Sequence, residues 1–296
     1  MNGIVNIYKE KGLTSRDVVN IVRGITKCKA GHTGTLDPDA EGVLPVCLGR
    51  ATKIADYIMA DDKEYIADVI LGTSTNTQDA SGEILESKPF CGDLLETYDA
   101  IQNFIGQIKQ IPPMYSAIKV GGKKLYEYAR QGITVERKPR EVTIHAIEIL
   151  RADLPKSFKI RVTCSKGTYI RTLCADFGEA LNSKAHMGEL LRTRSGGFRV
   201  ENALKLAELS DIAANGEIAS VIMPMDIALS HFPKITISSE ADKWLKNGNK
   251  MPLEFVHADI KLMDDTEYLA YDAKGSLAGI FILSDKEHIK PRVMLL

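Results

Sequence analysis

The chain has 296 residues, of which 44% are hydrophobic and 26% charged, a composition ordinary for a globular protein. This length suits one large domain or two unequal ones with a sizeable core. The formal net charge of −1 excludes a uniformly basic nucleic-acid-binding protein. Nucleic-acid binding must therefore rest on local patches of charge.

The cysteine pattern and the hydrophobic runs indicate in which compartment the protein resides and whether it binds a metal. No CxxC pair occurs among the five cysteines, Cys28, Cys47, Cys91, Cys164 and Cys174. Without paired Cys or Cys/His spacing we expect no zinc site, and an odd count without a disulfide framework suits a reducing compartment. We expect no signal peptide and no membrane span, because no long apolar run follows a basic start and none reaches roughly 18 residues. These features predict a cytoplasmic protein.

In the first part of the chain, short strands are predicted between helices and one glycine-rich loop. Thr14 or Ser15 can cap a helix that carries Val18 and Val22. Residues 31–42, GHTGTLDPDAEG, hold three glycines and a proline and are predicted to form a loop. The other expected elements are strands at 3–8, 43–48 and 65–71, helices at 52–59 and 94–104, and a polar turn at 72–82.

The second part predicts a long hairpin, more helices and a small β-rich module. The expected elements are a hairpin of strands 142–150 and 158–164, a helix at 168–181, a strand at 188–195, and helices near 202–209 and 217–223. Phe232-Pro233 is predicted as a domain boundary. Beyond it we expect a helix around Lys243 and strands at 268–271, 277–283 and 293–296. Strands and helices mix without regular alternation, which favours the α+β class over a doubly wound sheet.

Residues 112–140 differ from the rest of the chain in charge. They contain seven basic and two acidic residues, giving +5 locally and leaving −6 elsewhere. Tyr115, Tyr126 and Tyr128 lie among basic residues that include Lys123 and Lys124. Cations interleaved with tyrosines can follow phosphates and stack bases. A solvated amphipathic hairpin would have the same pattern, so the residues alone leave both interpretations open.

Asp37 is the sharpest candidate for chemistry. It lies in Gly31-His32-Thr33-Gly34-Thr35-Leu36-Asp37-Pro38, where glycines allow close backbone approach to a ligand and Pro38 stiffens the loop. An Asp before Pro is more often a turn former, and that alternative is the stronger one on residues alone. His32 could equally be a base, a stacking group or a structural histidine.

Two further candidates lie elsewhere. Arg171 follows Ser165-Lys166-Gly167-Thr168-Tyr169-Ile170 early in a predicted helix, and its planar fork could hold a carboxylate or a phosphate. A surface arginine is the simpler interpretation. Tyr65 lies in a predicted strand, where a half-buried sheet tyrosine is the common case.

GHTGTLDPDAEGVLPVCLGRATK resembles the signature of the TruB family, the bacterial tRNA pseudouridine-55 synthases. The segments KEKGLTS, DKEYIADVILG, residues 75–79, IPPMYSAIKVGGKKLYEYARQGI, CSKGTYIRTL and residues 188–192 resemble other blocks of this family in order. Together they cover most of residues 3–200, and the tail fits loosely. The family's Lys-Pro-x-Gly block here has Glu10 after Lys9, and its Leu-Arg-Arg block here reads Leu190-Leu191-Arg192.

The resemblance implies a role for each matching residue. Asp37 would be the catalytic aspartate, Tyr65 an active-site tyrosine that stacks on the target base, and Arg171 the partner of the aspartate. Tyr169 and Leu190 would pack around the flipped uracil. The expected substrate contacts are His32, Lys9, Lys123 and Lys124.

The implied reaction breaks the glycosidic bond of one tRNA uridine, turns the uracil and rejoins it through carbon. Atoms and oxidation state are conserved, so no redox cofactor and no metal is expected. The base must leave its stack first. Asp37 could attack the sugar carbon as in glycosidases, or help remove a sugar proton to give a glycal, with Tyr65 a candidate base. Both routes stay open.

We therefore expect an α+β pseudouridine synthase catalytic domain at 1–230 with residues 112–140 as an RNA-gripping insertion. A shortened PUA-like domain at 233–296 would follow. The expected partner is the T-arm of tRNA, with no membrane and no protein partner, and the expected state is a monomer. Two rivals are a non-catalytic RNA-binding or tRNA-folding protein on the same fold, and a synthase for another, guide-dependent RNA. Intact Asp37, Tyr65 and Arg171 argue against the first, and the short tail without basic extensions against the second.

Overall fold

A nine-stranded mixed sheet runs through residues 1–199 of the computed structural model, which describes all 296 residues. Its main path has the order β1-β3-β12-β4-β11-β10-β7, with β2 paired to β3 and β13 paired to β12. The strands are β1 (Gly3–Lys9), β2 (Ala30–His32), β3 (Glu41–Leu48), β4 (Lys63–Leu71), β7 (Gly106–Gln110), β10 (Arg140–Asp153), β11 (Ser157–Cys164), β12 (Ala185–Ser195) and β13 (Phe198–Arg199).

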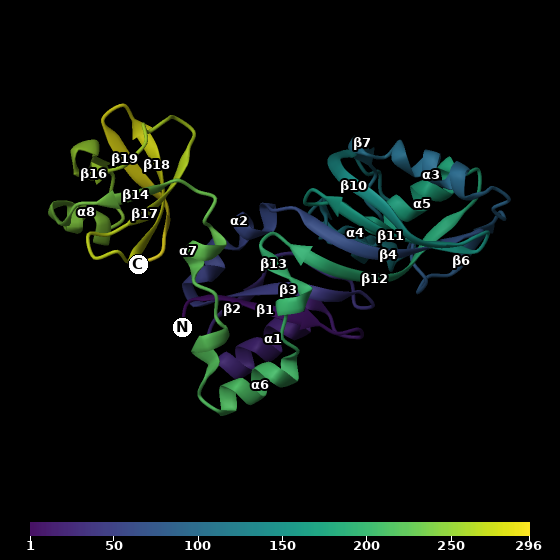
Figure 1. The fold of residues 1–296 in the computed structure, drawn as a ribbon, viewed down its shortest axis with the longest axis horizontal. Helices are drawn as coiled ribbons and strands as arrows, with labels where there is room; N and C mark the ends of the chain where they lie inside the picture. The colour runs from purple at the N-terminus through teal and green to yellow at the C-terminus, as the bar shows by residue number, and fades with distance from the viewer.

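β12 joins the two halves of this sheet. It pairs antiparallel with β4 along most of its length and parallel with β3 through Leu191↔Glu41 and Arg192↔Gly42. The other pairs of the sheet are antiparallel. Figure 1 shows β12 crossing from the half that holds β1 and β3 to the half that holds β10 and β11. The mixed sheet with helices confirms the expected α+β class.

Eight α-helices surround the sheets. Thr14 caps the first helix through a capping box with Asp17, and Val18 and Val22 are buried on its inner face. No helix is long and apolar enough to cross a membrane. The helices are α1 (Ser15–Thr26), α2 (Ala55–Ala60), α3 (Leu94–Gln102), α4 (Leu125–Ala129), α5 (Ile170–Ala180), α6 (Leu206–Ala214), α7 (Met225–Ala228) and α8 (Asp242–Lys246).

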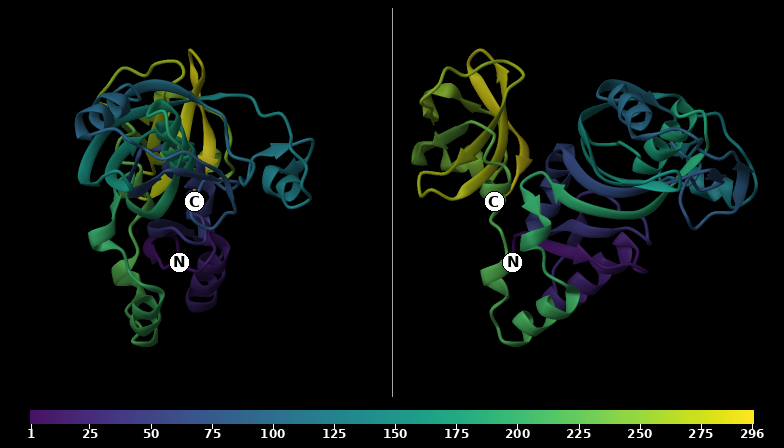
Figure 2. Two further views of the ribbon diagram at one scale, coloured as in Figure 1. Left: turned by 90° about the vertical axis from the view of Figure 1, so that its right-hand side faces the viewer. Right: turned by 45° about the vertical axis from the view of Figure 1, so that its right-hand side comes forward.

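Short elements complete the chain. The basic segment, residues 112–140, contains α4 and a hairpin, and it stands away from the main sheet at the right of the left-hand view in Figure 2. The small hairpins are β5 (Thr73–Thr75) with β6 (Ile84–Ser87), and β8 (Lys119–Val120) with β9 (Lys123–Lys124). The 3-10 turns are η1 (Gly49–Ile54), η2 (Val200–Asn202), η3 (Ile218–Val221), η4 (Ser239–Ala241) and η5 (Leu253–Phe255).

Several predicted boundaries differ from the structure. The loop predicted at 31–42 is shorter, because β2 pairs with β3 through His32↔Val46 at its start and β3 begins at Glu41. The helix predicted at 52–59 is η1 followed by α2. Short strands such as β2, β7 and β14 (Lys234–Ile237) were not predicted, since short strands are stabilised by distant partners rather than by their own pattern.

The tail forms a six-stranded sheet of order β15-β19-β18-β17-β14-β16, which confirms a small β-rich, PUA-like module. Arg50 and Lys53 donate to the carbonyls of Leu295 and Met294, and apolar residues of both sheets form one buried cluster. The tail therefore packs directly on η1. The strands are β14 (Lys234–Ile237), β15 (Met251–Pro252), β16 (Val256–His257), β17 (Glu267–Tyr271), β18 (Leu277–Asp285) and β19 (His288–Met294).

Ile280 tests this contact, because it is fully buried in the cluster that also holds Ile4 and Val43 of the main sheet. Ile280→Ala should lower the free energy of unfolding by about 2–5 kcal/mol through lost contacts and a cavity. Urea unfolding measures this change. Ile260→Ala, at a side chain that is 48% exposed in the same module, should stay within about 0.5 kcal/mol of wild type. Equal effects of the two changes would contradict the packed interface.

Candidate active site

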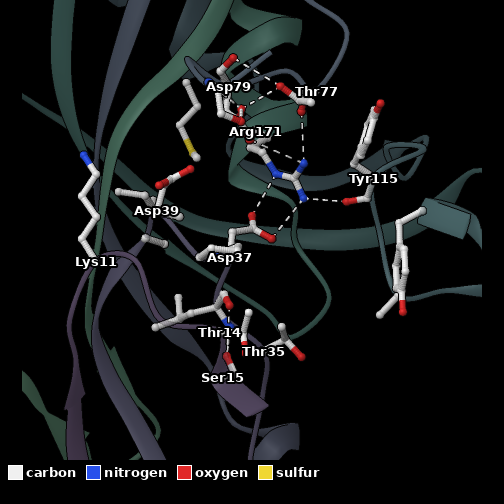
Figure 3. A pocket seen from close by; sticks show the side chains of 18 of the residues that line it. Lys11, Thr14, Ser15, Thr35, Asp37, Asp39, Thr77, Asp79, Tyr115 and Arg171 are labelled. Carbon is white, nitrogen blue, oxygen red and sulfur yellow. Dashed lines mark hydrogen bonds and ion pairs between the residues drawn. The ribbon is translucent and has the colours of Figure 1, made fainter. Parts of the chain in front are cut away.

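A cleft of about 1340 Å³ opens beside the loop that carries Asp37. One wall comes from the start of α1, another from residues 77–81 and β12, and a third from the basic segment. Figure 3 shows Asp37 between Lys11 on one side and Tyr115 on the other, with Arg171 directly above it. Asp37 thus lies among side chains from these walls, and Asp39, Asp68, Asp79 and Glu189 line the cleft as well.

Arg171 binds Asp37 with both arms of its fork. Its Nε lies 3.0 Å from Oδ2 of Asp37, and its Nη2 lies 3.4 Å from Oδ1. The remaining donors go to the carbonyls of Thr77 at 3.1 Å and Tyr115 at 2.9 Å, and Nη1 lies 3.7 Å from Asp79. The Arg171 side chain is only 6% exposed. Because every arm is engaged, the guanidinium fixes the direction of the carboxylate.

Two opposing effects act on the charge of Asp37. Burial raises the pKa of its carboxyl above the ordinary value, and the Arg171 guanidinium opposes this rise. The neighbouring Asp79 adds to the rise, and the Lys9 ammonium works against it. With a bidentate cation in contact, we conclude that the carboxylate is ionised at neutral pH.

The loop around Asp37 is held from below by Lys9 and Ser15. The Lys9 ammonium is fully buried and donates to the carbonyls of Glu10, Pro38 and Ala40 at 3.1, 3.0 and 2.6 Å. Ser15 Oγ donates to the Leu36 carbonyl at 3.0 Å and accepts the Leu36 N–H at 2.9 Å. Burial lowers the pKa of Lys9 to about 8.

The expectation that Lys9 binds substrate is wrong in this structure. A side chain with no exposed surface, whose donors are already used by carbonyls, has no atom left for RNA. Its contacts make it a support of the Asp37 loop instead.

The two expected tyrosines lie behind the wall of the cleft. Tyr65 on β4 is 9% exposed and belongs to the apolar cluster that contains Leu36 and Leu190. Burial raises the pKa of the Tyr65 phenol, and the nearby Arg192 guanidinium opposes part of this rise. Burial also raises the pKa of Tyr169, whose backbone N–H and carbonyl are both bound by the Gln110 side chain. Both phenols are therefore neutral at physiological pH.

His32 and Leu190 line the cleft. The Gly34 N–H donates to Nδ1 of His32 at 3.3 Å, which leaves Nε2 as the nitrogen that carries the proton. Burial lowers the pKa of His32, and the Arg192 guanidinium adds to this. His32 is therefore a neutral donor at the cleft.

Lys124 also lines the cleft, whereas Lys123 lies on the hairpin beside it. The Lys124 ammonium lies 5.4 Å from the centre of the Tyr126 ring, and Lys123 lies 5.9 Å from that of Tyr128. Each cation thus rests over an aromatic face.

The structure thus brings Asp37, Arg171, His32 and Leu190 to one cleft, with Tyr65 and Tyr169 behind it. Asp79 and Arg192 were missed as parts of this site. Asp79 lies in the polar turn that was singled out, where Thr77 and Ser81 donate to its carboxylate. No local pattern marks it as a neighbour of Arg171.

Sequence comparisons were made with families and with curated proteins. The TruB family pseudouridylate synthase (N terminal domain) profile matches residues 22–170, and the tRNA pseudouridylate synthase B C-terminal domain profile matches residues 171–230. A tRNA pseudouridine synthase B from Bacillus pumilus (strain SAFR-032) is 46% identical over 87% of this chain and 86% of its own length. A protein of the same name from Alkaliphilus oremlandii (strain OhILAs) is 43% identical over 100% of this chain and 98% of its own.

The fold of the chain is also similar to that of solved structures. One described as a Cbf5-Nop10-Gar1 complex has a TM-score of 0.75 at 29% identity and covers 99% of this chain and 84% of that chain. Another, described as an H/ACA RNP bound to a substrate RNA containing 2′-deoxyuridine, has a TM-score of 0.74 at 26% identity, with 99% and 85% covered.

The buried ammonium of Lys9 predicts a pH dependence of stability. In the unfolded chain Lys9 keeps its proton up to about pH 10.4, whereas its pKa in the fold is about 8. Between these values the unfolded state binds more protons, so this group's contribution to the free energy of unfolding rises with pH. Because Lys63 and the buried cysteines also titrate in this range, the quantity to follow is a difference. In urea unfolding from about pH 7 to 10, the stability of wild type relative to Lys9→Met should rise with pH. The exposed Lys11→Met control should keep this rise, and parallel curves for wild type and Lys9→Met would contradict the burial.

Proposed function

Because the chain belongs to the TruB family of pseudouridylate synthases, we propose that it converts the uridine at position 55 in the T-loop of tRNA into pseudouridine. The observation that carries the proposal is the bidentate Asp37–Arg171 pair in a cleft large enough for an extruded nucleotide. Relatives named tRNA pseudouridine synthase B, similar over the whole chain, support tRNA as the substrate.

The uridine must leave its stack before its glycosidic bond can reach Asp37. Leu190 in the cleft wall, with the ring of Tyr65 behind it, offers apolar and aromatic surface that replaces the lost stacking. Tyr169 would enclose the base from the start of α5. The neutral His32 would donate from Nε2 to a group of the opened RNA loop.

We propose that the carboxylate of Asp37 acts directly on the sugar. Its attack on the electron-poor sugar carbon breaks the bond to uracil nitrogen 1, and the electron pair leaves with the uracil. After the uracil turns, its carbon 5 attacks the same sugar carbon and displaces the carboxylate. Loss of the carbon 5 proton to solvent and uptake of a proton at nitrogen 1 then restore the ring. Arg171 keeps the carboxylate charged and aimed throughout.

The glycal route needs a base for the sugar proton. Tyr65 is a poor phenolate, because burial raises the pKa of its hydroxyl. This favours the carboxylate of Asp37 as the group that meets the sugar, with Tyr65 as an aromatic support behind Leu190.

The division into domains is also proposed from the family membership. Residues 1–230 would form the catalytic domain, with residues 112–140 gripping RNA, and residues 233–296 the PUA-like domain. We also propose that the protein acts in the cytoplasm as a monomer that needs no protein partner.

Asp37→Asn tests the proposal most simply. The amide keeps the shape of the side chain and suits the turn, but it neither attacks nor stabilises an electron-poor sugar carbon. Single-turnover release of the hydrogen on uracil carbon 5 from a T-arm RNA should fall on the order of 10⁴-fold or more. RNA binding should persist, since phosphate contacts and stacking supply most of it.

Asp39→Asn is the matched control, because Asp39 lines the same cleft on the same loop but is exposed. It should turn over nearly as wild type. Near-normal turnover by Asp37→Asn would remove this residue from the chemistry. Joint loss of binding and turnover would mark it as a structural turn residue.

Arg171→Gln should shift the pH dependence of the single-turnover rate. The rate requires ionised Asp37, so it falls as the pH drops through the pKa of that carboxyl. Arg171 opposes the rise of this pKa, so its removal should move the acidic fall to higher pH and lower the plateau. Circular dichroism checks that the variant is folded. An unmoved acidic fall would contradict the pairing.

Lys123→Ala with Lys124→Ala should weaken RNA binding and reduce its dependence on salt. Each lost phosphate contact should lower the slope of log affinity against log salt by roughly 0.7–0.9. Lys243→Ala with Lys246→Ala on α8 makes an equal change of charge in the tail and should leave the slope nearly unchanged. If the first pair also leaves it unchanged, these lysines only solvate the hairpin.

A further inference from the structure

Arg192 is a buried cation to which the proposed reaction assigns no role. Its residue is 1% exposed, and it lies where β12 pairs with two strands at once, opposite Gly42 of β3 and Tyr65 of β4. A buried guanidinium is strongly destabilising unless its donors are matched. Where those donors go therefore indicates what the residue does.

The two hydrogen bonds of Arg192 reach both ends of the Asp37 loop. Nε donates to the carbonyl of Val43 at 2.7 Å, just past the end of the loop, and Nη2 donates to the carbonyl of Gly34 at 3.2 Å, near its start. A planar fork that holds two carbonyls fixes their separation. The Arg192 side chain thus links the two ends of the loop, in addition to the backbone bond from the Thr33 N–H to the Pro45 carbonyl at 3.1 Å.

The side chains of Lys9 and Ser15 hold only the middle of the loop. Lys9 binds the carbonyls of Pro38 and Ala40, and Ser15 binds Leu36. Neither reaches Gly34 or Val43. The backbone also approaches closely here, because a Cβ on Gly42, whose φ is +106°, would lie 2.2 Å from the Arg192 carbonyl.

We infer that Arg192 is a positioning residue that closes the Asp37 loop at its base and so aims the carboxylate at the sugar. The inference rests on the proposed function, since the aim of Asp37 matters only if Asp37 acts. Arg171 sets the charge and rotation of the carboxylate, whereas Arg192 sets the place of the backbone that carries it. The two arginines therefore have separable effects.

Arg192→Met and Arg192→Lys test this inference on the full-length enzyme with a T-arm RNA. Methionine fills the space without donors, and lysine keeps the charge but replaces the rigid planar fork with one flexible ammonium. The single-turnover rate should fall about 100-fold in Arg192→Met, a size typical of misplaced reacting groups, and less in Arg192→Lys. RNA affinity should change less than about threefold. The acidic fall of the rate should stay at the wild-type pH, because Arg171 still faces Asp37.

Arg194→Met is the control on the same strand, where the side chain makes only a 3.5 Å contact to the Gly196 carbonyl, and it should retain the wild-type rate. A wild-type rate in folded Arg192→Met would overturn the inference, as would an acidic fall shifted to higher pH. If Arg192→Met does not fold, Arg192→Lys decides in the same way: a wild-type rate overturns the inference, and a rate lowered about tenfold with unchanged affinity supports it. Failure of the wild-type enzyme itself on this RNA would instead contradict the proposed function.

Discussion

The contact between Asp37 and Arg171 is the constraint on which the rest of the site depends. A partly buried carboxylate tends to take up a proton, and a cation in direct contact favours its charged form. Arg171 meets this need through two arms, at 3.0 and 3.4 Å. Its other donors hold the carbonyls of Thr77 and Tyr115. The same side chain thus ties together the Asp37 loop, the polar turn and the base of the basic segment.

The loop that presents Asp37 is fixed largely through its backbone. Lys9 and Arg192 are buried cations that donate to carbonyls of residues 34–43. Carbonyl partners satisfy these cations without placing a second carboxylate next to Asp37. Arg171 is then shared only with the more distant Asp79, at 3.7 Å. This arrangement holds the glycine-containing Asp37 loop in one conformation before RNA binds. Less reorganisation of the loop is then needed during the reaction.

The fold class and most of the long helices and strands could be predicted from the sequence, because their hydrophobic periods and capping residues are local features. The Thr14 cap and the hairpin at 140–164 are examples. Short strands such as β2 depend on partners far away in the chain and left no local signal. The pairing of Asp37 with Arg171 spans 134 residues, so physical reasoning on either residue alone favoured a turn former and a surface arginine. The family resemblance identified the pair, but it assigned Lys9 to RNA because sequence does not show burial.

The most direct test of the account is nucleotide-resolution mapping of pseudouridine in tRNA from a strain that lacks this gene. The account predicts that the modification at position 55 disappears, returns with the wild-type gene, and does not return with Asp37→Asn expressed at the same level. Pseudouridine that persists at position 55 in the deletion strain, or that Asp37→Asn restores, would contradict it.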